Sequence, residues 1–334
     1  IERQPSRFLL RELTAIAAGL PRADRPRLRV AADAVAAFVG ARGDDVVFVD
    51  NATTGANAVL RSFPLQAGDE VLVSSLGYGG VTLAAGFAAR ERGAVLRTVD
   101  APPPYRPDAI AEAFEAAVTP RTRLAVVDHI AAETALVLPL RQIAARLKPR
   151  GIAVLADGAH APGAIALDVP SYGVDWYVAN LHKWAFVPRS SGFLWAAPER
   201  QPGLHPAVIS WGLDQGFATE FDLPGTRDPS PHLTAPAALA FIDWLGGLDA
   251  VLAHTHDLAW RGAHLLARRW QAPIEIPRSL AGPMVTVMLP AALGSTREDA
   301  AALRDGLLFD DRIEVQVHAS RGRLHAREIG RAHV

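Results

Sequence analysis

The sequence predicts an α/β protein, in which a mainly parallel sheet is flanked by helices on both faces and is followed by a smaller α+β C-terminal domain. Strand-like and helix-like segments alternate through most of the chain. Several strand-like segments are continuously apolar, as expected for strands buried on both faces. The alternation stops at about Thr234. The 334 residues, 50% hydrophobic and 21% charged, are enough for a large core and two domains.

Seven short apolar segments are the expected strands of the large sheet. In order they are Val46–Asp50, Glu70–Ser75, Ala94–Asp100, Leu124–Ile130, Ile152–Asp157, Trp176–Leu181 and Gly192–Trp195. Helical patterns fill most of the intervals, at Thr54–Phe63, Gly79–Arg92, Pro107–Val118 and Pro139–Leu147. Parallel strands need long crossover connections, usually helices, so this order predicts a mainly parallel sheet.

The C-terminal part has a different pattern. Helices are expected at Ala235–Trp244, Ala250–Trp270 and Arg297–Leu308, and strands at Met284–Leu289 and Ile313–Ala319. We therefore expect a large domain over residues 21–234 and a small domain over residues 235–327. The N-terminal segment, residues 1–20, has no initiator methionine, and we expect it to be truncated. Residues 328–334 read EIGRAHV, which back-translates into a common sequencing adapter. We expect this tail to be non-native and the small domain to be truncated.

Charge and composition exclude several kinds of partner. The formal net charge is -1, from 34 basic and 35 acidic residues, so no global field favours nucleic acid or an anionic membrane. No apolar run reaches the roughly 18 residues of a membrane span. The absence of cysteine excludes disulfides, cysteine-ligated zinc and a thiol nucleophile. We expect a cytoplasmic protein that acts on a small molecule.

A lysine and an aspartate follow neighbouring predicted strands. Asp157 ends one buried strand in Asp-Gly-Ala-His160, and Lys183 follows the next in Asn180-Leu-His182-Lys. Ligands usually bind at such strand ends, where a partly desolvated amine becomes nucleophilic toward a carbonyl. Asp157 suits a protonated pyridine nitrogen, which keeps the ring of pyridoxal 5'-phosphate (PLP) electron-withdrawing. The alternative is a surface lysine beside a strand-terminal aspartate.

Two further turns follow predicted strands. Thr53 and Thr54 open a helix, where free N–H groups and the helix dipole favour an anion; the alternative is a plain N-cap. Tyr78 lies among glycines in Leu76-Gly-Tyr-Gly-Gly80 and can present its flat face to an aromatic ring; the alternative is a turn with a packed tyrosine. His129, His160 and His182 lack the spacing of a helical zinc motif, so we expect no metal.

These segments together resemble the class V aminotransferase family of fold-type I PLP-dependent enzymes. Within it the chain is most similar to the isopenicillin N epimerase-like branch, which also includes C–S lyases. The resemblance covers about residues 5–327. Its marks are NATTGAN (Asn51–Asn57), LGYGG (Leu76–Gly80), DHI (Asp128–Ile130), DGAHAPG (Asp157–Gly163), NLHKW (Asn180–Trp184) and PGTRDPS (Pro224–Ser230).

The resemblance implies a role for each matching residue. Lys183 would carry PLP as a Schiff base and move protons at the substrate carbon. Asp157 would bind the pyridine nitrogen, and His160 would lie near the ring hydroxyl oxygen. The remaining roles are ring stacking by Tyr78, phosphate binding by Thr53, Thr54, Asn180 and His182, and binding of the substrate α-carboxylate by Arg327. Thr226 would reach the phosphate of a neighbouring subunit, which implies a homodimer with shared active sites.

The resemblance leaves the reaction open. The chain is expected to act on an amino acid or amino-acid-derived substrate through an external aldimine, as an epimerase or C–S lyase. The alternatives are a class V aminotransferase and a non-catalytic PLP-fold binding module. A cysteine desulfurase is disfavoured because it needs a mobile cysteine, which this chain lacks. Ala132 departs from the family pattern, in which a polar residue often stands there and contacts the ring oxygen.

Overall fold

The computed structural model describes residues 26–330, so the N-terminal segment and the last four residues of the expected tail lie outside them. A seven-stranded sheet forms the centre of the large domain, in the order β1-β7-β6-β5-β4-β2-β3. The strands are β1 (Val46–Val49), β2 (Glu70–Ser74), β3 (Val95–Val99), β4 (Thr122–Asp128), β5 (Ala153–Gly158), β6 (Trp176–Asn180) and β7 (Gly192–Ala196). Strand β7 runs antiparallel to both neighbours and all other pairings are parallel, which confirms the mainly parallel sheet.

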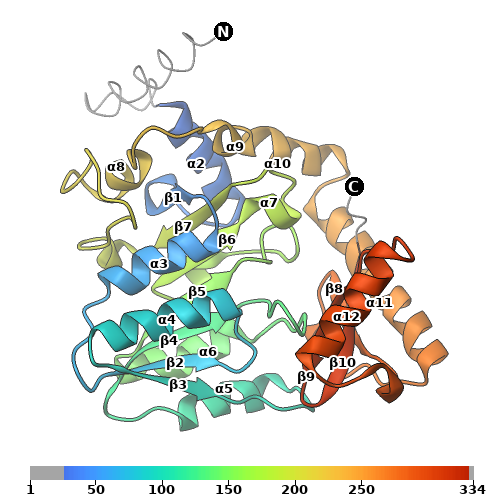
Figure 1. The fold of residues 1–334 in the computed structure, drawn as a ribbon. Coiled ribbons are helices and arrows are strands. Elements are labelled where there is room, and N and C mark those ends of the chain that lie inside the picture. Colours follow the sequence, from blue (N-terminus) through green and yellow to red (C-terminus); the bar gives the residue numbers. More distant parts are fainter. Residues whose placement is uncertain (1–25, 331–334) are drawn as a thin grey trace.

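Helices cover both faces of this sheet (Figure 1). The helices α2 (Arg27–Phe38), α5 (Pro107–Ala116) and α6 (Leu140–Leu147) share one apolar cluster with the sheet. The helices α3 (Ala52–Ser62), α4 (Gly79–Glu91) and α8 (Phe217–Asp222) share another. Within β5, Val154 belongs to the first cluster and Leu155 to the second, because successive side chains of a strand point to opposite faces. This two-sided burial explains the continuously apolar strands.

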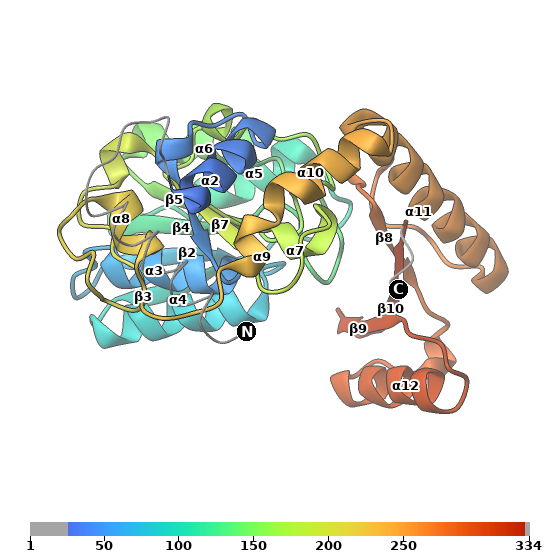
Figure 2. The same cartoon turned by 90° about the horizontal axis from the view of Figure 1, so that it is seen from above.

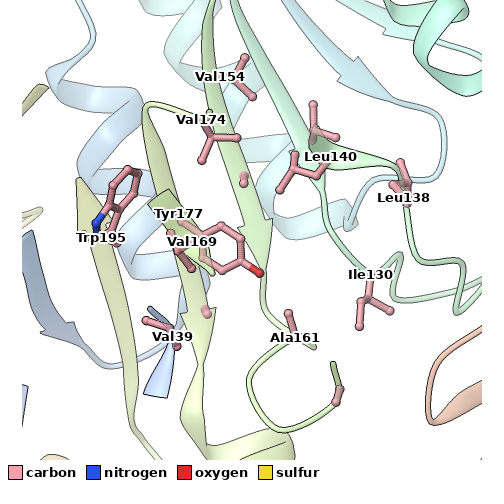
Figure 3. Packing of buried hydrophobic residues seen from close by; sticks show 14 of the residues in the cluster. Val39, Ile130, Leu138, Leu140, Val154, Ala161, Val169, Val174, Tyr177 and Trp195 are labelled. Atoms are coloured by element: carbon pink, nitrogen blue, oxygen red, sulfur yellow. The ribbon is translucent and has the colours of Figure 1, made fainter. Parts of the chain in front are cut away.

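The first apolar cluster extends to Ile130 and Ala161, in the segments that follow β4 and β5 (Figure 3). The fully buried Tyr177 belongs to the same cluster, and its hydroxyl is 2.7 Å from Nδ1 of His129. Burial lowers the pKa of His129 to about 3, so this histidine is neutral and has a packing role.

The small domain stands to one side of the large domain, and α10 (Ala235–Trp244) leads to it after the short α9 (Ser230–Leu233) (Figure 2). It contains α11 (Leu248–Trp270), α12 (Arg297–Phe309) and an antiparallel sheet in the order β8-β10-β9. The strands are β8 (Met284–Met288), β9 (Gln316–Ser320) and β10 (Arg323–Ile329). The small α+β domain is thereby confirmed, and the expected tail begins inside β10. Within residues 26–330, no single helix is long and apolar enough to span a membrane. Two consecutive helical segments, Ser230–Trp244 and Leu248–Trp270, pass this test only when taken together, and they are bent by 73° relative to each other.

Candidate active site

The carboxyl ends of β4, β5 and β6 bring the predicted residues to one edge of the large sheet. A cavity of about 520 Å³ lies there. It is lined by eight of the predicted site residues, namely Thr53, Thr54, Tyr78, Asp157, His160, Asn180, His182 and Lys183. Strand order accounts for this gathering, because parallel neighbours end at the same edge.

Lys183 lies in α7 (Leu181–Trp184), the short helix that directly follows β6. Burial lowers the pKa of its amine to about 8, and the negative charge of Asp157 works in the opposite direction. The amine nitrogen lies 3.0 Å from Nε2 of His160. Trp184 Nε1 donates to the other ring nitrogen of His160 at 3.4 Å. Because indole only donates, the His160 proton lies on Nε2, and the contact suits a neutral lysine amine that accepts it.

Asp157 is a buried acid with one unused oxygen. Its Oδ1 accepts the backbone N–H of Ala159 at 2.9 Å, whereas its Oδ2 is buried without a hydrogen-bond partner among the described residues. Burial raises the pKa of Asp157, and Lys183 opposes that rise. An unpaired buried carboxylate oxygen indicates a partner that the chain itself does not supply.

Asp128 is a site residue to which the sequence analysis gave no role. It pairs in register with Asp157 on the neighbouring strand, lines the cavity, and accepts the backbone N–H of Tyr78 at 3.0 Å. Burial and the charge of Asp157 raise its pKa. The bond to Tyr78 holds the start of α4 against the sheet, so Asp128 positions the aromatic side chain at the cavity mouth. The position of the DHI motif at the end of a predicted strand was the available signal.

The turn before α3 forms another wall of the cavity. The N-cap of α3 is Asn51, whose side chain accepts the N–H of Thr54 at 2.9 Å, so the cap is not a threonine. Asn180 Oδ1 accepts the N–H of Ala52 at 2.7 Å and thereby joins the end of β6 to the first turn of α3. With the amide oxygen engaged, Asn180 keeps its NH₂ group for the cavity. The threonine hydroxyls and the dipole of α3 favour an anion here.

The DGAHAPG segment closely approaches the backbone at the end of α7, the short helix that carries Lys183. Gly163 has a φ of +80°, and a Cβ built on it would lie 2.5 Å from the carbonyl oxygen of Trp184. Only glycine combines that conformation with such a close approach. The close contact fixes the distance between α7 and the loop that carries His160, and it therefore fixes the position of Lys183 relative to His160.

Two predicted residues do not line the cavity. Arg327, on β10, donates to the carbonyl oxygen of Ala132, a residue of the cavity wall, and its positive charge lowers the pKa of both Lys183 and His160. It therefore stands close behind the wall. Thr226 is exposed in the loop before α9 and is not among the residues that line this chain's cavity. Among residues 26–330 no group of three or more histidine, aspartate or glutamate side chains has metal-binding geometry.

PLP fits the donors of this cavity. An amine of lowered pKa suits its aldehyde, the unpartnered Asp157 oxygen suits a ring N–H⁺, and the first turn of α3 suits a phosphate. The three features line one cavity, as a ring carrying the aldehyde, the nitrogen and the phosphate arm requires.

Comparisons with known proteins give consistent results. A family model described as aminotransferase class-V matches residues 27–260. The isopenicillin N epimerase of Streptomyces clavuligerus is 33% identical over 333 residues, covering 94% of this chain and 79% of the relative. A candidate L-cysteine desulfhydrase of Oryza sativa subsp. japonica is 33% identical over 328 residues, covering 92% of this chain and 68% of the relative. One solved structure of the same fold is a mutant of C-DES with glycine covalently linked to its PLP cofactor. It has a TM-score of 0.77 and 21% sequence identity, and the match covers 97% of this chain and 89% of that one.

Proposed function

This chain belongs to the class V aminotransferase family, and from that premise we propose that it is a PLP-dependent enzyme of the epimerase or C–S lyase type. Its substrate is an amino acid or a compound derived from one. The observation that carries the proposal is that the amine of Lys183, with its lowered pKa, shares one cavity with the unpartnered carboxylate oxygen of Asp157. Relatives named for epimerisation of isopenicillin N and for desulfhydration of L-cysteine support the two reaction types.

The proton-handling residues are Lys183 and His160. PLP, when bound, supplies an aldehyde to an amine and a ring that withdraws electrons from the substrate carbon. A lysine whose pKa is about 8 is partly neutral near pH 7 and is able to take and return a proton at that carbon. His160 orients the amine through its 3.0 Å contact, and Asp157 presents its carboxyl group to the same cavity.

Binding residues surround this pair. Thr53, Thr54, Asn180 and His182 hold the phosphate at the first turn of α3, and Tyr78 covers the ring. Arg327 holds the substrate α-carboxylate, for which its planar guanidinium is suited. In the described structure Arg327 contacts only a backbone carbonyl, that of Ala132, so a carboxylate is a stronger competing acceptor.

We further propose a homodimer in which Thr226 reaches the cofactor phosphate of the partner. Thr226 is exposed, and its neighbour Arg227 is fixed by an ion pair to Asp50 at 2.9 Å. In the loop before α8, the side chain of Trp211 is 87% exposed and that of Ile209 is 54% exposed. Apolar side chains of this size are usually covered in an interface. A cytoplasmic location stays a prediction, consistent with the lack of cysteine.

Chemical trapping tests the proposal, because the chain contains only two lysines, Lys148 and Lys183. Borohydride reduction of the PLP-loaded protein is expected to attach the cofactor covalently to Lys183, detected as a phosphopyridoxyl peptide by mass spectrometry. Lys183→Ala is expected to lose both the adduct and the visible absorbance band. Lys148→Arg, a control that keeps the 2.5 Å ion pair with Asp175 at the opposite edge of the sheet, is expected to retain both. Label on Lys148, or an unchanged band in Lys183→Ala, would contradict the proposal.

A further inference from the structure

His232 is a buried histidine for which the proposed function has no use. It lies in α9, is only 2% exposed, and stacks on the ring of Phe48 in β1 with ring centroids 4.7 Å apart. Burial and the positive charge of Arg227 lower its pKa to about 3, so the ring is neutral. A neutral imidazole has one donor and one acceptor nitrogen, and each needs a partner when the ring is buried.

Both ring nitrogens of His232 have such a partner. Arg227 contacts Nε2, and because a guanidinium only donates, Nε2 accepts and the ring proton lies on Nδ1. Nδ1 donates this proton to Oγ of Ser191, which is 3.0 Å away. His232 therefore connects the loop that carries Arg227 to the residue directly before β7.

Ser191 is buried and holds one of the proposed phosphate ligands. Its carbonyl oxygen accepts the N–H groups of Leu181 at 3.0 Å and of His182 at 3.2 Å, the first two residues of α7. The ring of His182 lies against the same backbone, with Nδ1 2.6 Å from this carbonyl oxygen and 3.0 Å from the amide nitrogen of Ser191. The position of the His182 ring in the cofactor cavity therefore depends on the position of Ser191.

Arg227 also reaches the turn before α3. The guanidinium nitrogen that contacts His232 also forms the 2.9 Å ion pair with Asp50. Asp50 directly precedes Asn51, the N-cap of the helix whose first turn lines the cavity. The side chain of Asp50 is 50% exposed, and an ion pair this exposed contributes little to stability. The main consequence of the pair is geometric, because one nitrogen holds both α9 and the turn before α3.

We propose that Arg227 and His232 are positioning residues of the phosphate site. They belong to one series of contacts, Asp50–Arg227–His232–Ser191–His182, which joins a phosphate ligand at the start of α7 to the first turn of α3. Neither Arg227 nor His232 lines the cavity, so both act through the residues that do. Ligands held in place from outside the site bind more tightly than ligands left free to move. This inference rests on the proposed function, because it requires a cofactor that carries a phosphate.

The test compares PLP with pyridoxal, which has the same aldehyde and ring but no phosphate. The dissociation constants of both compounds are measured by visible absorbance as they are added to cofactor-free protein. Arg227→Gln, His232→Phe and Ser191→Ala are each expected to weaken PLP binding about tenfold and to change the pyridoxal constant less than about twofold. Arg227→Lys, which keeps a positive charge beside Asp50, is expected to retain most of the PLP affinity. The double variant of Arg227→Gln with His232→Phe is expected to lose little more than either single variant, because both interrupt the same series of contacts.

The control is Arg146→Gln, which removes a partly exposed arginine that pairs with Glu115 at 2.5 Å between α6 and α5, and it is expected to change neither constant. Equal weakening of PLP and pyridoxal binding would indicate a general structural role and would overturn the inference. Weaker PLP binding in Arg227→Gln but not in Ser191→Ala would also overturn it, because the effect would then not pass through His182. If the unmodified protein binds neither compound, the proposed function is wrong and the inference falls with it.

Discussion

Lys183 and Asp157 place an amine and a carboxyl group in the same buried space. Burial lowers the pKa of Lys183 to about 8 and raises the pKa of Asp157, while the attraction between the two charges works against both shifts. The pKa of each residue therefore depends on the charge of the other. Arg327 adds a second positive charge behind the cavity wall, which lowers the lysine pKa further.

This coupling predicts how cofactor capture depends on pH. Only the unprotonated amine attacks an aldehyde, so the rate at which cofactor-free protein captures PLP is expected to rise as the pH passes through about 8. Asp157→Asn removes the charge that raises the lysine pKa, so the midpoint is expected at a lower pH. Stopped-flow absorbance across pH measures it. Asp168→Asn, at an exposed position, is the control, and an unmoved midpoint in Asp157→Asn would refute the coupling.

Gly163 allows a test of the close approach between its loop and the backbone of Trp184. Gly163→Ala combines a left-handed φ of +80° with a Cβ only 2.5 Å from a carbonyl oxygen. Gly151→Ala is a matched control, since φ is +74° and no atom lies within 4 Å of the added Cβ. We expect the control to cost about 1 kcal/mol of unfolding free energy and Gly163→Ala about 2 kcal/mol more. Urea denaturation measures both, and equal losses would show that the approach is unimportant.

At the scale of elements, the strands and helices of the large domain were predictable because burial on two faces gives a clear pattern. Strand β5 shows this, since residues 153–158 are all buried and the sequence there is almost entirely apolar. Strand β10 was not predicted. It reads RLHAREI, in which Arg323, His325 and Arg327 occupy one face, and three polar side chains in alternation lower the apolar signal of a strand. Packing of the other face against the small domain overrides that weak propensity.

The cavity was predictable to a similar extent. Residues that stand at strand ends in sequence, such as Asp157 and Lys183, converge because parallel strands end together. The role of Asp128 was not predictable, because it depends on one hydrogen bond to the backbone of Tyr78 across two strands.

The opposite end of the sheet is held by Glu70, at the start of β2. Glu70 accepts hydrogen bonds from Thr119, from Arg97 of β3 and from Arg121 beside β4. These bonds, with the Thr119 hydroxyl the largest cause, lower the pKa of Glu70 to about 2 from 4.5. The residue thus joins the edge strand β3 to the body of the sheet.

A carboxyl whose pKa is lowered by folding stabilises the protein fully above its unfolded pKa. We therefore expect the stability that Glu70 contributes to be complete above about pH 4.5 and to disappear as the pH falls toward 2. Glu70→Gln is expected to cost about 1 kcal/mol at pH 7 and to flatten this part of the pH profile. Chemical denaturation at a series of pH values measures it. Glu112→Gln, in an exposed ion pair, is the control, and an identical slope in both variants would contradict the prediction.

At the scale of the whole molecule, the proposed dimer predicts where an exposed aromatic residue matters. Trp211→Ser is expected to weaken self-association at least tenfold, because a large apolar side chain would lose its cover in the interface. Cofactor binding is expected to weaken with it if Thr226 contributes to the partner's phosphate site. Light scattering across concentrations measures the association. Phe309→Ser, 75% exposed at the end of α12 in the small domain, is the control. A monomeric wild-type protein would contradict the prediction directly.

The two β-sheets divide the work of the proposed enzyme along the chain. Every residue that lines the cofactor cavity lies between positions 51 and 183, whereas Arg327, the proposed ligand of the substrate carboxylate, lies on β10 near the other end. Substitutions in the C-terminal strands can therefore change substrate selectivity without altering the residues that line the cofactor cavity. Libraries randomised around Arg327 on this antiparallel sheet would explore the same route in the laboratory.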